Sequence, residues 1–318
     1  MPAAPDRILL AAPRGYCAGV DRAVQTVERA LEVYGPPVYV RKEIVHNKHV
    51  VEELRDRGAI FVDSEEQIPS GSTAVFSAHG VAPSVHANAQ ARQLVTIDAT
   101  CPLVTKVHVE ARKFAAQGYT IVLIGHAGHE EVEGTMGEAP GNIVLVQSED
   151  EVDELDVPDE ERIAYISQTT LSVDETQSII ERLRARFPRI VGPRTDDICY
   201  ATTNRQAAVK QLASHCDLVL VIGSRNSSNS NRLVEVAREC GADSYLIDNE
   251  TEVREEWLEG KSVLGITSGA SAPEGLVQRL VDFFRARGTE NVSELDVIQE
   301  DVRFMLPKTI RQAIAAGA

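Results

Sequence analysis

The chain has 318 residues, of which 43% are hydrophobic and 25% are charged, a composition typical of folded globular proteins. At this length we expect two or three domains rather than one core. The net charge of −16 argues against a nucleic-acid partner bound through its phosphates. A small anionic ligand stays possible, because helix N-termini and neutral donors bind phosphate without net positive charge.

The sequence also carries no sign of membrane insertion or export. Residues 1–6 are polar, and no signal-peptide core follows them. No apolar run approaches the length of a membrane span. We therefore expect a cytoplasmic protein that has no membrane partner.

Short apolar runs of strand type alternate with helical patterns along the chain. Candidate strands lie at 8–10, 38–40, 74–77, 94–97, 120–124, 163–166, 218–222 and 263–266. Helical patterns follow most of them, for example at 48–57 and beyond Pro83. This alternation predicts parallel sheets whose ligands bind at the carboxyl ends of the strands.

Three cysteines, Cys17, Cys101 and Cys199, each stand between a strand pattern and a helical pattern. Pro102 suits the first turn of the helix after Cys101, and residues 203–206 form a capping-box pattern after Cys199. A thiolate is stabilised at such a position by the helix dipole. Cys216 and Cys240 lie in apolar helical surroundings and are interpreted as small core residues.

Each third of the chain thus contains one cysteine turn and two further loops rich in histidine or small polar residues. This triplication predicts an α/β fold of three similar lobes with small, mainly parallel sheets, in a pseudo-threefold trefoil around a common centre. The predicted lobes are 1–97, 98–195 and 196–285, followed by a charged C-terminal tail at 286–318.

Three converging cysteines indicate a metal site. A structural zinc would need a fourth ligand, such as a histidine, and a catalytic zinc rarely has three thiolates. A [4Fe–4S] cluster held by three cysteines leaves one iron open to substrate. The alternative is three unrelated buried cysteines.

Several loop residues could bind a phosphate or diphosphate. Ser227, Ser228 and Asn229 stand at a predicted helix start after Gly223, where backbone N–H groups and hydroxyls can surround an anion. Ser271 stands similarly before Pro273, and the histidines His46, His79 and His129 follow strands. The alternatives are helix capping for the serines and structural hydrogen bonding for the histidines.

Glu131 is the carboxylate best placed beside these donors. Negative neighbours would favour its protonated form, which suits proton delivery, and the Thr169 hydroxyl could relay that proton. A solvent-facing glutamate and a threonine in a local turn are the alternatives.

The motifs resemble those of one known family. They are Pro13–Ala23 (PRGYCAGVDRA), Val45–Asn47 (VHN), Ser77–Gly80 (SAHG), Asp98–Pro102 (DATCP), Gly125–His129 (GHAGH), Ser167–Ser172 (SQTTLS), Asp197–Gln206 (DICYATTNRQ), Asn226–Asn231 (NSSNSN) and Gly269–Pro273 (GASAP). From about Ile8 into the tail, the chain resembles the 4-hydroxy-3-methylbut-2-enyl diphosphate reductases, which catalyse the last step of the methylerythritol phosphate route to isoprenoids. The resemblance implies a three-lobed α/β fold around a central iron–sulfur cluster.

The resemblance also implies roles for the candidate residues. Cys17, Cys101 and Cys199 would hold a [4Fe–4S] cluster, while Glu131 and Thr169 would relay protons. The allylic diphosphate substrate would be bound by His46, His79, His129, Ser227, Ser228, Asn229 and Ser271. Reduction would remove water and yield isopentenyl or dimethylallyl diphosphate.

One position departs from the family pattern. Glu130 stands where the family usually has proline, so two neighbouring carboxylates could serve as the acid. We favour Glu131, because Val132–Thr135 (VEGT) follows it as in the family pattern. No glycine fingerprint for a nicotinamide cofactor occurs, so a reduced ferredoxin or flavodoxin is the expected electron donor.

Two other functions remain possible from the sequence. A non-redox hydro-lyase would use the open iron only as a Lewis acid and would turn over without reductant. A cluster- or zinc-bearing sensor or binding module would keep the cysteines without needing Glu131, Thr169 or the three histidines.

Overall fold

The computed structural model describes residues 4–316, and their contacts divide them into two compact units. The first unit comprises Met1–Val20, His46–Val50 and Tyr200–Arg303, and the second comprises Asp21–Val45, Val51–Cys199 and Phe304–Ala318. No helix within the described part is long and apolar enough to cross a membrane.

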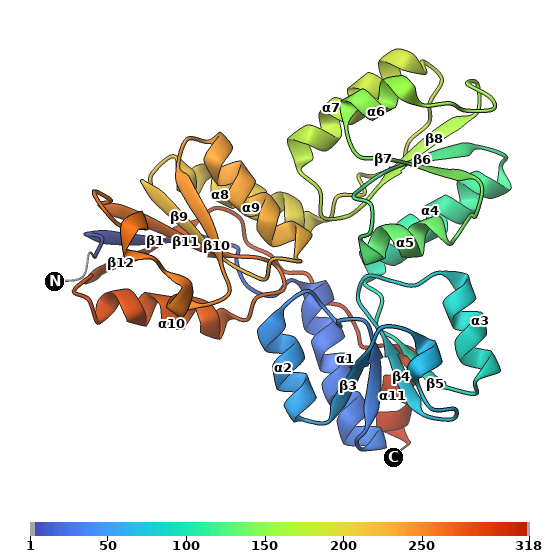
Figure 1. Ribbon diagram of the computed structural model, residues 1–318, viewed down its shortest axis with the longest axis horizontal. Coiled ribbons are helices and arrows are strands. Elements are labelled where there is room, and N and C mark those ends of the chain that lie inside the picture. The colour runs from blue at the N-terminus through green and yellow to red at the C-terminus, as the bar shows by residue number, and fades with distance from the viewer. Residues whose placement is uncertain (1–3, 317–318) are drawn as a thin grey trace. The chain divides into compact units, whose positions relative to one another are not determined.

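The first unit is built on a five-stranded sheet with the order β10-β9-β11-β1-β12, and all its strand pairs are parallel (Figure 1). Its strands are β1 (Arg7–Ala12), β9 (Leu218–Ile222), β10 (Asp243–Ile247), β11 (Val263–Ser268) and β12 (Asn291–Asp296). Its helices are α8 (Tyr200–Ala213), α9 (Ser228–Glu239) and α10 (Glu274–Arg285). Short 3-10 helices lie at Glu250–Glu252 and Glu255–Trp257.

Both faces of this sheet are buried, because alternate side chains of each strand point to opposite sides. Ile8 packs with Leu264, Leu276 and other side chains of β11 and α10 on one face. Leu9 packs with side chains of α8 and α9 on the other face. The carboxyl ends of these strands therefore carry the loops that are free to form a site.

The second unit contains two further parallel sheets, of order β3-β2-β4-β5 and β7-β6-β8. The first of them consists of β2 (Val38–Arg41), β3 (Ala59–Val62), β4 (Thr73–Phe76) and β5 (Val95–Asp98). The other consists of β6 (Thr120–Ile124), β7 (Ile143–Val146) and β8 (Ile163–Ser167). A 3-10 helix lies at Glu65–Gln67.

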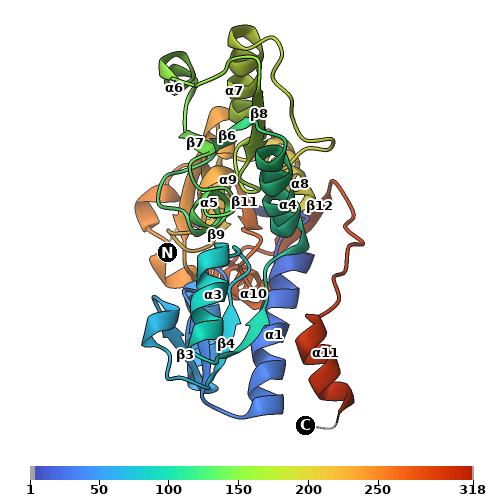
Figure 2. The same ribbon diagram turned by 90° about the vertical axis from the view of Figure 1, so that its right-hand side faces the viewer.

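The remaining helices pack on these two sheets or lead from one unit into the other. They are α1 (Ala18–Tyr34), α2 (Lys48–Asp56), α3 (Pro83–Ala91), α4 (Pro102–Ala116), α5 (Glu130–Met136), α6 (Glu149–Glu154), α7 (Val173–Arg186) and α11 (Lys308–Ala315). Figure 2 shows α11 beside α1, and Ile310 of α11 is fully buried. The C-terminal helix is therefore packed onto the second unit.

The predicted α/β fold with small parallel sheets is confirmed. The lobe boundaries and the pseudo-threefold arrangement stay predictions. The first strand differs from expectation, since β1 pairs with β11 and β12 of the last third of the chain. The charged tail likewise contains β12 and α11.

The expected capping box is wrong, because α8 begins at Tyr200 and its residues 203–206 already lie within the helix. Pro102 does stand in the first turn of α4, as predicted, and Cys101 is the N-cap residue of that helix.

Candidate functional site

Glu131 and Thr169, both in the second unit, are joined by two hydrogen bonds. Glu131 Oε1 accepts from the backbone N of Thr169 at 2.7 Å, and Glu131 Oε2 accepts from Thr169 Oγ1 at 3.0 Å. The two residues are only 2% and 4% exposed. A buried carboxylate is costly unless it is hydrogen-bonded, and these two bonds satisfy that need. The solvent-facing alternative for Glu131 is therefore wrong.

His129 stands directly before this glutamate as the N-cap residue of α5. Its Nδ1 accepts from the backbone N of Glu131 at 3.1 Å. A ring nitrogen that accepts a hydrogen bond carries no proton, so neutral His129 carries its proton on Nε2.

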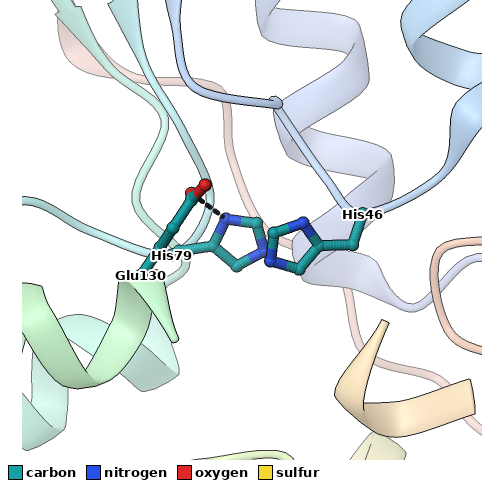
Figure 3. A group of neighbouring side chains, drawn as sticks. All are labelled: His46, His79 and Glu130. Carbon is teal, nitrogen blue, oxygen red and sulfur yellow. Dashed lines mark hydrogen bonds and ion pairs between the residues drawn. The ribbon is translucent and has the colours of Figure 1, made fainter. Parts of the chain in front are cut away.

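His79 lies in the turn after β4, and its ring meets that of His129 edge-on, with 5.8 Å between the centroids. Its Nδ1 contacts Glu130 Oε2 at 3.1 Å, and Figure 3 shows the carboxylate pointing at that nitrogen. The adjacent carboxylates thus differ in their partners, since Glu130 contacts a histidine and Glu131 contacts Thr169. The sequence showed both glutamates but not this division.

Cys101 and Cys199 belong to the second unit and Cys17 to the first. The backbone N of each donates to a carbonyl two residues beyond the end of a strand. Cys17 donates to Ala270 O after β11 at 3.1 Å, Cys101 to Ala78 O after β4 at 3.0 Å, and Cys199 to Thr169 O after β8 at 3.0 Å. This repeated bond is a structural counterpart of the triplication seen in the sequence.

The chemistry of these three residues fits an iron–sulfur cluster. All three are partly exposed cysteines next to the N-terminus of a helix. The backbone N of Val20 approaches Cys17 Sγ at 3.5 Å, and the charge of Cys101 acts on the Arg22 guanidinium. Such surroundings stabilise thiolates, which are the form that binds metal.

Within the first unit, the candidate anion-binding residues come together. Ser227 is the N-cap residue of α9, and its hydroxyl accepts from the N and Oγ of Ser230. Asn229 Oδ1 accepts from the backbone N of Ala270 at 2.9 Å, and Ser271 Oγ donates to His46 O at 2.9 Å. Ser228 opens α9 beside them.

Asn226 is a neighbour of His46 that sequence reasoning did not single out. Its Nδ2 lies 3.4 Å from His46 Nδ1. Its place in the NSSN run, two residues before Ser228, was the available signal.

Ionic groups that hold the segments before Cys101 and Cys199 were also missed. Asp197 Oδ2 accepts from Ser167 N at 3.0 Å, and its Oδ1 accepts from Lys106 Nζ at 2.9 Å. Lys106 also donates to the carbonyls of Thr195 and Asp196. Together these bonds fix the segment that leads into Cys199.

Arg22 plays the corresponding part beside Cys101. Its Nη1 donates to Ala99 O and Thr100 O, and its Nε donates to Met305 O at 2.8 Å. Burial lowers the pKa of Arg22 against the opposing effect of Asp98 and Cys101. Arg22 lies within the motif quoted around Cys17, but its partners are distant in sequence.

Comparison with known proteins gives a consistent set of relatives. A family model described as LytB protein matches residues 8–285. The 4-hydroxy-3-methylbut-2-enyl diphosphate reductase of Acidothermus cellulolyticus is 60% identical over 98% of this chain and 92% of its own length. The Nocardia farcinica protein of the same name is 60% identical over 96% of this chain and 91% of its own length.

Two solved structures are also similar. The E-1-hydroxy-2-methyl-but-2-enyl-4-diphosphate reductase of Plasmodium falciparum has a TM-score of 0.96 and 37% identity, covering 98% of this chain and 99% of that one. A second structure, of an (E)-4-hydroxy-3-methyl-but-2-enyl diphosphate reductase described as the terminal enzyme of the non-mevalonate pathway, has a TM-score of 0.63 and 30% identity, covering 88% of this chain and 99% of its own.

Proposed function

The chain belongs to the LytB family, and on that premise we propose that it reduces (E)-4-hydroxy-3-methylbut-2-enyl diphosphate to isopentenyl and dimethylallyl diphosphate, the last step of the methylerythritol phosphate pathway. The observation that carries this proposal is the 60% identity to a named reductase over 98% of the chain. The buried pair of Glu131 and Thr169 supports it, since a reductive dehydroxylation needs a proton donor. We place the reaction in the cytoplasm.

Cys17, Cys101 and Cys199 would hold a [4Fe–4S] cluster, which would supply electrons one at a time and one open iron for the substrate hydroxyl. Partly exposed cysteines at helix N-termini suit this role. Reducing equivalents would come from a reduced ferredoxin or flavodoxin.

The substrate diphosphate would be bound by neutral and titratable donors. These are the side chains of Ser227, Ser228 and Asn229 at the start of α9, that of Ser271 before α10, and the three histidines His46, His79 and His129. A helix N-terminus adds backbone N–H groups and a favourable dipole for the anion. This accounts for phosphate binding by a chain whose net charge is −16.

Glu131 and Thr169 would handle the protons. Thr169 Oγ1 now donates to Glu131 Oε2. With a proton on Oε2 the bond reverses, so that Glu131 donates to Thr169 Oγ1 and the threonine hydrogen is free to pass to the substrate.

The overall reaction is balanced by two electrons and two protons. The bond between the allylic carbon and the hydroxyl oxygen breaks, and the oxygen leaves as water after taking one proton. The two electrons supplied by the donor go to the allylic carbons, and the second proton adds at either end of the allyl group. Addition at one end gives isopentenyl diphosphate, and addition at the other gives dimethylallyl diphosphate.

The test is anaerobic turnover with a chemical reductant, using protein whose iron and sulfide contents have been measured. We expect wild type to form both products and Glu131→Gln to lose at least about 10²-fold in kcat, the usual contribution of a general acid. No products from fully loaded wild type would refute the function. Turnover without reductant would instead indicate a hydro-lyase.

A further inference from the structure

The rings of His79 and His129 are neighbours, but their hydrogen bonds select opposite neutral tautomers. His129 Nδ1 accepts from an N–H group, so its neutral ring presents an N–H at Nε2. His79 Nδ1 faces the Glu130 carboxylate, which can only accept, so His79 must donate from Nδ1. The neutral ring of His79 therefore presents a lone pair at Nε2.

This difference matters for an anionic ligand. A phosphate oxygen accepts hydrogen bonds, so neutral His129 can donate to it while neutral His79 would repel it. His79 can donate to phosphate from Nε2 only as an imidazolium. The adjacent carboxylate stabilises that cation, because an opposite charge in hydrogen-bond contact favours the protonated form of a histidine.

The surroundings of His79 within the second unit support this assignment. Glu130 is the carboxylate in contact with its ring, and His129 faces it edge-on. Glu131, the residue after Glu130, is engaged with Thr169 through both oxygens. His79 and Glu130 are largely buried, with side chains 14% and 19% exposed, so solvent screens the pair only partly.

We propose that His79 and Glu130 form a proton-loading pair, in which binding of the substrate diphosphate is coupled to the uptake of one proton at His79 Nε2. Glu130 is thereby a positioning residue, since it fixes the tautomer of His79 and stabilises its charged form. The inference rests on the proposed function for the identity of the ligand.

Glu130→Pro tests this role with little disturbance to the backbone. Glu130 is the first residue of α5, a position where proline is well tolerated in helices. The substitution removes the carboxylate, so the His79 proton is free to move to Nε2 and the neutral ring can donate. Glu133→Gln is the matched control, because Glu133 is an exposed acid on the same helix.

The experiment is calorimetric titration of cluster-loaded, oxidised protein with the allylic diphosphate, without reductant, in two buffers of different ionisation enthalpy. At pH 8 the terminal phosphate, with its second pKa near 6, is already fully ionised, so its own ionisation adds nothing to the measured proton uptake. We expect wild type and Glu133→Gln to take up about one proton per diphosphate, and Glu130→Pro to take up almost none.

A second readout is the pH dependence of the dissociation constant. At pH values where His79 is neutral in the unliganded protein, the affinity of wild type should fall by up to about tenfold for each unit that the pH rises. The affinity of Glu130→Pro should change little over the same range. We expect Glu130→Gln to keep proton uptake, since its carbonyl still accepts from Nδ1, but to bind about tenfold more weakly at pH 8.

Two outcomes would overturn the inference. One is wild-type uptake near zero at pH 8, and the other is uptake that survives in Glu130→Pro, which would assign the proton to another group such as Glu131. These results are independent of turnover, because the titration contains no reductant. Failure of product formation with normal proton uptake would refute the reductase and leave the diphosphate-binding pair standing.

Discussion

Glu131 binds Thr169 through both of its carboxylate oxygens, one on the backbone amide and one on the side-chain hydroxyl. The hydrogen bond from the Thr169 backbone N–H holds the carboxylate in place, in whichever direction the hydrogen bond to the hydroxyl runs. The hydroxyl bond alone can reverse direction and carry a proton. The structural and chemical parts of this contact can therefore be separated by mutation.

Thr169→Val removes the hydroxyl but keeps the backbone N–H that binds Glu131 Oε1. We expect kcat to fall about 10²-fold, because the proton relay is lost. The free energy of unfolding should fall by about 1–3 kcal/mol, because buried Glu131 Oε2 loses a hydrogen bond. Thr169→Ser, which restores the hydroxyl, should recover most of the activity. Equal loss in both variants would contradict the relay, because Thr169→Ser would then lack activity although its hydroxyl is present.

The five cysteines should separate into two groups. Serine at Cys17, Cys101 or Cys199 should lower iron and sulfide content and abolish the visible absorption of a cluster, since each would remove one of only three ligands. Cys240 is exposed, so its interpretation as a core residue is wrong, and serine there should leave both unchanged. Burial raises the pKa of Cys216 to about 12, so this thiol should also resist alkylation. Normal iron content in Cys101→Ser would contradict the ligand set.

Glu110 on α4 should make stability depend on pH. Burial of the carboxyl group is the main cause that raises its pKa from 4.5 to about 7, and the neighbouring Asp197 carboxylate is the second cause. Between these values the native protein binds more protons than the unfolded chain, so stability falls as pH rises through this window. Glu110→Gln avoids that loss, and we expect it to be about 1 kcal/mol more stable than wild type at pH 8 and closer to it at pH 5.

Thermal unfolding midpoints at the two pH values would measure this effect. Glu133→Gln again serves as the control for loss of one negative charge. An advantage of Glu110→Gln that is the same at both pH values would exclude titration of Glu110 as the cause.

Gly80 should tolerate no side chain. It has φ of +80°, and an added Cβ would lie 2.9 Å from Cε1 of His108, whose buried ring is held by Glu138 at 2.7 Å. Gly141 has nearly the same φ, +83°, with nothing within 4 Å of an added Cβ. Alanine at Gly141 should therefore cost about 1–2 kcal/mol from backbone strain alone.

Alanine at Gly80 should cost about 1–3 kcal/mol more, because of the clash. It should also raise KM, since Gly80 follows His79 directly in the chain. Unfolding midpoints and steady-state kinetics of the two variants would separate strain from displacement. Equal effects of both substitutions on KM would contradict this account.

The sequence predicted the local surroundings of the cysteines well. A strand pattern, a cysteine and a helical pattern are all short-range signals, and Cys101 does stand at the N-cap of α4. The helix start predicted at Ser227–Asn229 was equally local and is confirmed, with Ser227 as the N-cap residue of α9. The cluster and the roles of individual residues stay proposals.

What the sequence did not show depends on pairings between distant residues. β1 lies beside β11, with Ile8 opposite Leu264, and no local periodicity specifies that partner. β12 has few apolar residues and was therefore assigned to the tail. The contact of Glu130 with His79 joins residues 51 positions apart, so only the fold could show that Glu130 and Glu131 have different partners.

The repeated bond from each cysteine N–H to a carbonyl beyond a strand involves polypeptide groups alone. The bond is made between main-chain groups, so the main chain at Cys17, Cys101 and Cys199 is held by the loops that follow β11, β4 and β8. Damage to a cluster by oxygen would then leave the anchoring points of its ligands in place. The folded protein could then take up iron and sulfide again and rebuild the cluster without first unfolding.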